Sequence, residues 1–107
     1  MDKYVRDGKV AVLISKGYGA GWSTWLREDR YLFDPVIVGI LLDDSIDKQT
    51  QYDDILTYCH KIEPYGFFAG VDGLCVEWVA EGTAFRVTEY DGHETLERMS
   101  ETNWKVA

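Results

Sequence analysis

Two Asp-Gly pairs constrain the fold of this 107-residue chain more than any other feature, because each predicts a tight antiparallel turn. Asp7-Gly8 and Asp91-Gly92 can both adopt the positive φ angles that a two-residue type I′ turn requires. The first turn predicts a hairpin over residues 3–15, and the second joins strands 84–90 and 93–99. The two-residue loops also fix the facing pairs: Val5 and Val10, Arg6 and Lys9, Val87 and Leu96, Thr88 and Thr95, Arg86 and Glu97, Glu89 and Glu94.

In this register the second hairpin has one apolar face and one polar face. Val87 lies opposite Leu96 on the apolar face, and complementary side chains meet on the other. Glu89 and Glu94 face each other near the tip, where two like charges are expected to remain in solvent. The alternative for these two carboxylates is a general acid–base pair.

Other strands are predicted from the pattern of apolar residues. The run Val10–Ile14 hardly alternates, which indicates a strand buried on both faces. Residues 74–80 alternate between apolar and polar side chains, as expected of a strand with one solvated face. Residues 65–69 form another expected strand, and residues 70–73 form a turn.

Two helices are predicted on different grounds. Asp34-Pro35 supplies an N-cap acceptor and a ring with preset φ, so a buried short helix is expected over residues 36–42. Because this run is apolar nearly all round, a strand remains the alternative. The segment 47–62 is clearer, since its apolar residues repeat at helical spacing: Tyr52, Ile55, Leu56, Cys59 and Ile62.

These elements predict a single α+β domain over residues 1–107. It would hold an antiparallel sheet of about five or six strands, with one long and one short helix packed on one face. The chain contains no run of 18 apolar residues, so no membrane span is expected. The first residues lack an apolar stretch, so no signal peptide is expected either.

The chain is acidic, with a formal net charge of −8 from 11 basic and 19 acidic residues. Such a chain repels nucleic acid and anionic lipid, so neither is an expected partner. Residues 1–30 carry a net charge of +2, from six basic and four acidic side chains, and residues 31–107 carry −10. One hypothesis is an acidic face that meets a basic partner protein; the alternatives are solubility and favourable interaction with a helix dipole. The face would consist of Asp43, Asp44, Asp47, Asp53 and Asp54.

The segment Gly17–Trp25 is the most distinctive stretch, with three glycines in its first five residues. Closely spaced glycines can expose backbone N–H groups to a phosphate, and neighbouring aromatic rings can stack on a base. The alternative is a structural crossover that leads into a short turn or helix near Ser23, with Trp side chains in the core. The ligand or partner site would comprise Lys16, Gly17, Tyr18, Gly19, Gly21, Trp22, Ser23, Thr24, Trp25, Arg27 and Arg30.

Metal and cysteine chemistry have little support in the sequence. Cys59, His60, Cys75 and His93 match no zinc-ligand spacing, so neither a metal nor another cofactor is expected. Without a signal peptide, the two cysteines fit reduced thiols better than a disulfide. Catalysis would need a thiolate beside a base, or Glu77, Glu89 and His93 converging in one cleft.

Two stretches of the chain resemble a group of small bacteriophage and prophage proteins. They are Lys9–Leu13 with Gly17–Trp25, and Val76–Trp78 with Gly82–Val87 and Glu89–Gly92. The resemblance implies expression in a bacterial cytoplasm and a role in host takeover or counter-defence. It transfers no catalytic residues.

The first functional hypothesis is therefore a non-enzymatic binding protein. It would bind a host or defence protein, or sequester a phosphate-bearing, nucleotide-like ligand at the Gly17–Trp25 loop. A small enzyme with acid–base chemistry on a nucleotide or glycan is the second hypothesis. The third is a structural subunit in which the same loop forms a homo-oligomer interface.

Overall fold

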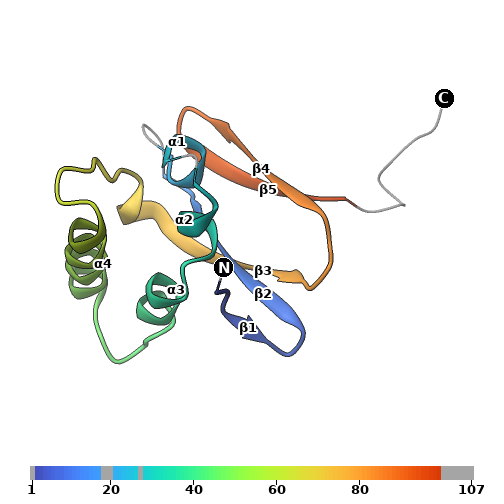
Figure 1. Cartoon of the computed structure of the whole chain (residues 1–107), viewed down its shortest axis with the longest axis horizontal. Helices are drawn as coiled ribbons and strands as arrows, with labels where there is room; N and C mark the ends of the chain where they lie inside the picture. The colour runs from blue at the N-terminus through green and yellow to red at the C-terminus, as the bar shows by residue number, and fades with distance from the viewer. Residues whose placement is uncertain (1, 18–20, 27, 100–107) are drawn as a thin grey trace.

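The computed structural model describes residues 2–17, 21–26 and 28–99. The fold is α+β, and its five strands form two antiparallel sheets rather than the one sheet expected (Figure 1). The first sheet has the order β1-β2-β3, and the second consists of β4 and β5. The strands are β1 (Val5–Arg6), β2 (Lys9–Ser15), β3 (Leu74–Ala80), β4 (Phe85–Tyr90) and β5 (His93–Arg98).

Strand β2 lies at the centre of the molecule and explains why there are two sheets. Ala11, Val12, Leu13 and Ile14 all have no exposed surface, so the prediction of burial on both faces is confirmed. Because both faces of β2 are apolar, both need a cover. The β4–β5 hairpin therefore packs against one face of the first sheet instead of extending its edge.

The other face of the first sheet carries the helices. Figure 1 shows α3 (Pro35–Leu41) and α4 (Lys48–Ile62) on this side, opposite the β4–β5 hairpin. The short turn or helix expected near Ser23 is a helix, α1 (Ser23–Leu26), and a second short helix that was not predicted, α2 (Asp29–Phe33), follows it. Helix α2 contributes to the hydrophobic cores on both faces of the first sheet. Tyr31 packs in the core on the helical side, and Phe33 packs in the core on the hairpin side.

Both α3 and α4 begin with an aspartate cap, and the cap of α3 is the one that the sequence predicts. The carboxylate of Asp34 accepts hydrogen bonds from the N–H groups of Val36 and Ile37, which decides residues 35–41 in favour of a helix. Asp34 also accepts a hydrogen bond from the Tyr58 hydroxyl at 2.8 Å and so ties α3 to α4. Asp47 caps α4 through the N–H of Thr50.

Both Asp-Gly hairpins form in the predicted register. Asp7 and Asp91 have φ angles of 53° and 49°, and the glycines that follow are also in the left-handed region. All the facing pairs expected in the two hairpins are present, including Arg86 opposite Glu97. The Nη2 atom of Arg86 lies 2.8 Å from a carboxylate oxygen of Glu97.

The strand expected over residues 65–69 is wrong. No strand among the described residues pairs with this stretch, and the N–H of Gly66 bonds back to the carbonyl of Glu63 in a turn. Without a neighbouring strand, the backbone of this stretch has no ladder to join. Phe68 nevertheless reaches the core, whereas Tyr65 and Phe67 are exposed.

In the described part of the chain, none of the helices combines the length and the apolar content that crossing a bilayer requires.

Candidate functional site

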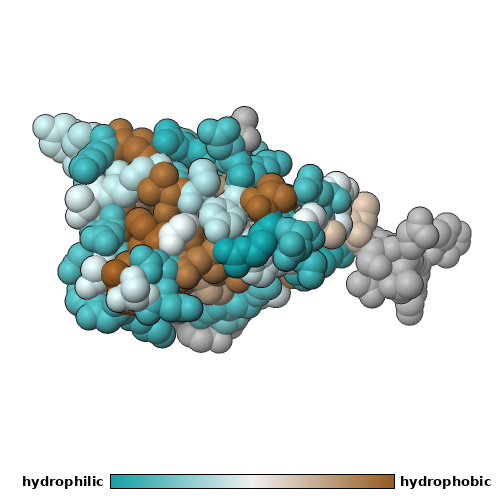
Figure 2. Space-filling model, turned by 90° about the horizontal axis from the view of Figure 1, so that it is seen from below, coloured by the Kyte–Doolittle hydropathy of each residue, from teal (hydrophilic) through white to brown (hydrophobic). Residues whose placement is uncertain are grey.

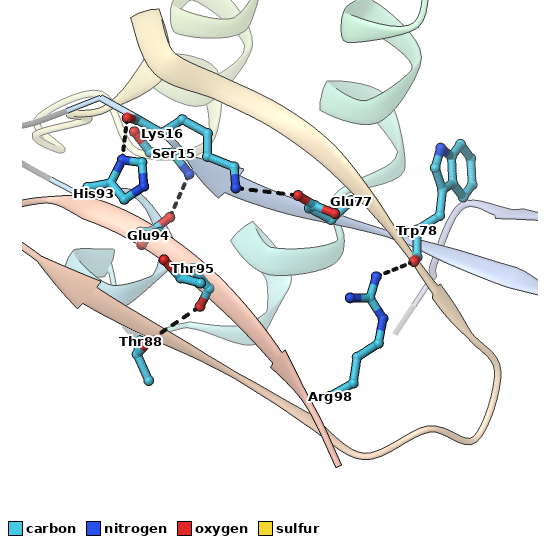
Figure 3. Close-up of polar contacts among 9 residues, drawn as sticks. All are labelled: Ser15, Lys16, Glu77, Trp78, Thr88, His93, Glu94, Thr95 and Arg98. Carbon is cyan, nitrogen blue, oxygen red and sulfur yellow. Dashed lines mark hydrogen bonds and ion pairs between the residues drawn. The ribbon is translucent and has the colours of Figure 1, made fainter. Parts of the chain in front are cut away.

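Glu94 is a fully buried carboxylate that joins the second hairpin to the end of β2, as Figure 3 shows, and also to the Gly17–Trp25 loop. One oxygen accepts a hydrogen bond from the N–H of Ser15 at 2.8 Å. The other accepts bonds from the N–H of Trp22 at 3.1 Å and of Thr24 at 3.0 Å, and from the Thr24 hydroxyl at 2.6 Å. The expectation that Glu94 lies in solvent beside Glu89 is therefore wrong.

The alternation of strand β5 accounts for the burial of Glu94. Side chains two residues apart share one face of a strand, and Leu96 packs into the core on the hairpin side. Glu94 therefore also faces inward, and it ends against the loop. Glu89 is exposed, and its carboxylate accepts the N–H of Gly92 within the turn at 2.7 Å.

The Gly-rich loop thus forms a small anion site, and the chain's own carboxylate occupies it. The N–H groups of Trp22 and Thr24, which sequence analysis offered to a phosphate, are directed at Glu94. Gly21 permits the close approach, because a Cβ there would lie 2.5 Å from the Thr24 hydroxyl and 3.1 Å from a Glu94 oxygen. Charge-assisted bonds of this kind are stronger than neutral ones.

The two tryptophans of the loop have different environments. Trp22 has no exposed surface, and its indole N–H donates to the carbonyl of Tyr31 at 2.7 Å. Its ring packs against Tyr31 and Phe68, with centroids 5.8 Å and 6.3 Å away. The stacking role expected for Trp22 is therefore wrong, and this ring is part of the core. Trp25 is 52% exposed.

The remaining residues of the expected loop site are dispersed. Lys16 pairs with Glu77 at 3.5 Å, and its carbonyl lies 2.6 Å from Nδ1 of His93 (Figure 3). Gly17 packs closely against Gly73, where a Cβ would lie 2.5 Å from the backbone nitrogen of Gly17.

Farther along the loop site, Arg30 is exposed, with its guanidinium carbon 5.5 Å from the centroid of the Tyr31 ring. Ser23 is half-buried. Three of the expected site residues lie outside the described part of the chain: Tyr18, Gly19 and Arg27.

Two of the groups expected of an acid–base enzyme make separate contacts. Glu77 pairs with the Lys16 side chain, whereas Glu89 bonds within its own turn. Four of the surface grooves are lined by described residues, and none of these four includes Glu77, Glu89 or His93.

The cysteines are poor nucleophiles in this environment. Burial is the main factor that raises the pKa of Cys59 to about 11, and burial also raises the pKa of Cys75. Both thiols are therefore held in the protonated form near neutral pH. Within residues 2–17, 21–26 and 28–99, no three His, Cys, Asp or Glu side chains come close enough to hold a metal ion.

The outer surface of α3 is apolar and open, which sequence analysis missed. The buried side chains of this helix are Ile37 and Val38. Val36 is 46% exposed, Gly39 is exposed and Ile40 is half-buried. These three residues share one side of the helix because they are spaced by three and four, and we call them the α3 face. Figure 2 shows a patch of apolar side chains over α3, bordered by hydrophilic residues.

Gly39 is not explained by packing within the chain. A Cβ at this position would meet no atom within 4 Å. Glycine inside a helix costs about 1 kcal/mol relative to alanine. The fold would thus tolerate a side chain at Gly39, and the bare backbone leaves the α3 face flat.

The predicted acidic face adjoins the α3 face at Asp43, whose N–H donates to the carbonyl of Ile40 at 3.2 Å. All five of its aspartates are exposed. Asp43 follows α3 directly and bonds to Ser45, which lowers the pKa of the Asp43 carboxyl; hydrogen bonds to Thr50 likewise lower the pKa of Asp47. Gln51 fixes the start of α4 beside the end of α3 by donating to the carbonyl of Ile40 at 3.2 Å. Asp43 and the first turns of α4 therefore border the C-terminal end of the α3 face.

No protein-family model, curated protein or solved structure matches this chain, so the site is interpreted from its own geometry.

Proposed function

We propose that this chain is a non-enzymatic binding protein that docks a partner protein on the α3 face and the adjoining acidic face. The observation that carries the proposal is the open apolar surface of α3. Val36 is half in solvent, and Gly39 lacks a side chain although the fold leaves space for one. Apolar patches with a polar rim are typical of protein interfaces.

The charges beside the α3 face indicate the chemistry of the partner. Residues 43–54 contain five aspartates and one lysine, which gives this segment a net charge of −4. No described residue forms a hydrogen bond or ion pair with the side chains of Asp44 and Asp54, so both are free to pair with a partner. A complementary surface would carry an apolar centre and a basic margin, and the charges would speed its approach.

The alternatives have less support. A nucleotide at the Gly17–Trp25 loop would have to displace Glu94 from the N–H groups of Trp22 and Thr24. An enzyme would need Glu77, Glu89 and His93 in one cleft, and they line none of the four grooves described above. The resemblance to phage proteins favours a host or defence protein in a bacterial cytoplasm as the partner.

Substitution of Gly39 tests this function directly. Gly39→Arg should preserve the fold, because arginine favours a helix more than glycine and no atom lies nearby. The long side chain should block the flat surface. We expect a basic protein that wild type captures from bacterial lysate to bind Gly39→Arg at least about tenfold more weakly, a loss of roughly 1.4 kcal/mol.

Thr95→Arg is the matched control, since it adds the same charge on the exposed side of β5. It should leave capture of the basic protein unchanged. Equal capture by wild type and both variants would refute docking on α3. Loss of a self-complex in Gly39→Arg, seen by light scattering, would instead identify a second copy as the occupant and overturn the proposed hetero-complex.

Charge reversal separates the electrostatic part of the proposal from the apolar part. Asp44→Lys with Asp54→Lys should weaken binding and flatten its dependence on salt, because fewer charges remain to be screened. The proposal requires both results. An unchanged salt dependence would show that the acidic face only confers solubility.

A further inference from the structure

A groove on another part of the molecule is formed by α1, α2 and strand β4. It has a volume of about 370 Å³. Its apolar wall contains Leu32, Phe33, Phe85 and Val87, and its polar residues include Ser23 and Thr24. None of the three residues of the α3 face lines it, so the groove is a separate surface.

Two carboxylates in this groove have no role in the fold that the structure shows. Glu28 stands at the N-cap position of α2 but makes no side-chain capping bond. Asp29 follows it in the first turn. Both side chains are exposed, and neither forms an ion pair with a described residue. The one cation among the described residues of the lining, Arg86, is already paired with Glu97 at 2.8 Å.

The aromatic part of the groove already accepts a cation from the chain itself. Phe33 and Phe85 meet edge to face, with centroids 6.1 Å apart and an angle of 87° between the rings. The ammonium of Lys3 lies 4.5 Å from the centroid of Phe33, within the range of a cation–π contact. The Phe33 ring therefore attracts positive charge, and Lys3, which is not among the described lining residues of the groove, already uses one such contact.

We propose that this groove binds a cationic side chain, lysine or arginine, of a protein partner. The aliphatic part of such a side chain would lie along Leu32 and Val87, and its charge would meet Glu28 and Asp29. Aromatic surface combined with carboxylates is the combination that a long cationic side chain needs for both its apolar stem and its charged end. The proposal does not depend on the α3 face.

The test uses capped tripeptides as probes and records amide chemical shifts of the ¹⁵N-labelled full chain. Glycine-lysine-glycine and glycine-arginine-glycine peptides distinguish the two cationic side chains, and a norleucine peptide supplies the uncharged stem. We expect saturable shifts at millimolar concentration for Thr24, Asp29 and Val87 with a cationic peptide. The norleucine peptide should give none.

Glu28→Gln with Asp29→Asn should weaken the binding of the cationic peptide about tenfold, because two exposed charge pairs are removed. Glu81→Gln with Asp91→Asn is the control, since it removes the same charge at two exposed turns. Unchanged thermal melting would show that each variant is folded. Absence of saturable shifts in the groove, equal shifts with norleucine, or equal weakening by the control pair would overturn the proposal.

Discussion

The loop around Trp22 and the outer surface of α3 differ in whether their binding groups are already used within the chain. At the loop, backbone N–H groups that could face a ligand are bonded to Glu94, and the large aromatic ring is inside the core. At α3, apolar side chains that could be covered remain in contact with water, and a glycine leaves the helix surface bare. The loop is closed by the chain itself, and α3 is open.

This contrast teaches that a group's chemical type does not decide whether it is available. The loop contains the more suggestive residues, yet its donors are already used. A ligand binds where the fold leaves interactions unmade, and α3 meets that condition. The predictions below test the difference between the closed and the open region, starting with the largest expected effect.

The two tryptophans should differ most. Trp22→Ala should lower the free energy of unfolding by about 4 kcal/mol, because it removes a buried ring and the indole bond to Tyr31. Trp25→Ala should change it by about 0.5 kcal/mol or less, since half of that ring is in solvent. Urea titration of both variants checks the pair, and similar losses would mean that the loop is not closed.

Replacing the internal anion should have the next largest effect. Glu94→Ala should lower the free energy of unfolding by about 3 kcal/mol, because it leaves the buried N–H groups of Ser15 and Trp22 without their acceptor. Glu89→Ala on the same hairpin should cost less than about 1 kcal/mol, since Glu89 is exposed. A loss as small for Glu94 as for Glu89 would contradict the bonding described for the carboxylate.

Alkaline pH should lower the free energy of unfolding by less than Trp22→Ala and Glu94→Ala do. The folded state raises the pKa of Cys59 from 9.0 to about 11, so it keeps a proton that the unfolded chain releases. The stabilisation from Cys59 is complete below pH 9 and is lost as pH rises toward 11. Tyr58, whose pKa is raised to about 12, extends the decline to higher pH.

Urea titrations at several pH values would measure this decline. The double variant Cys59→Ala, Cys75→Ala should show a flatter dependence of stability on pH between 9 and 11. An identical slope in wild type and the double variant would show that the thiols do not take part.

The open region should give the smallest change, and of opposite sign. Gly39→Ala should raise the free energy of unfolding by about 0.5 to 1 kcal/mol, because alanine favours the helix and meets no neighbouring atom. Thermal melting of the free protein checks this. Destabilisation would show that the bare backbone at Gly39 serves the fold, and it would contradict a role for Gly39 in docking.

The parts of the fold that local chemistry controls could be predicted from the sequence. Asp7-Gly8 and Asp91-Gly92 fixed two hairpins and their registers, because a type I′ turn leaves no freedom in pairing. The cap at Asp34 marked the start of α3, because its carboxylate accepts from N–H groups two and three residues later. These interactions join residues within a few positions of one another.

The parts that depend on distant residues could not be predicted. The partner of the loop, Glu94, is 70 residues from Thr24 in the sequence. Its shared face with Leu96 was the available signal for burial, but a carboxylate near a turn is more often solvated. The apolar sequence of α3 predicted a helix that is buried on every side. A helix that packs on one face of a sheet buries only part of its own surface.

The bonds to Glu94 also bear on the order in which the chain can fold. Ser15 and Glu94 are separated by 79 residues. The central strand β2 is therefore synthesised long before the carboxylate that accepts the N–H of its last residue. Contacts between such distant segments slow folding, because a long loop must close before they form. While the ribosome is still making the middle of the chain, the N–H groups near Trp22 must remain hydrated. These N–H groups gain their acceptor only when the β4–β5 hairpin has been synthesised and has folded.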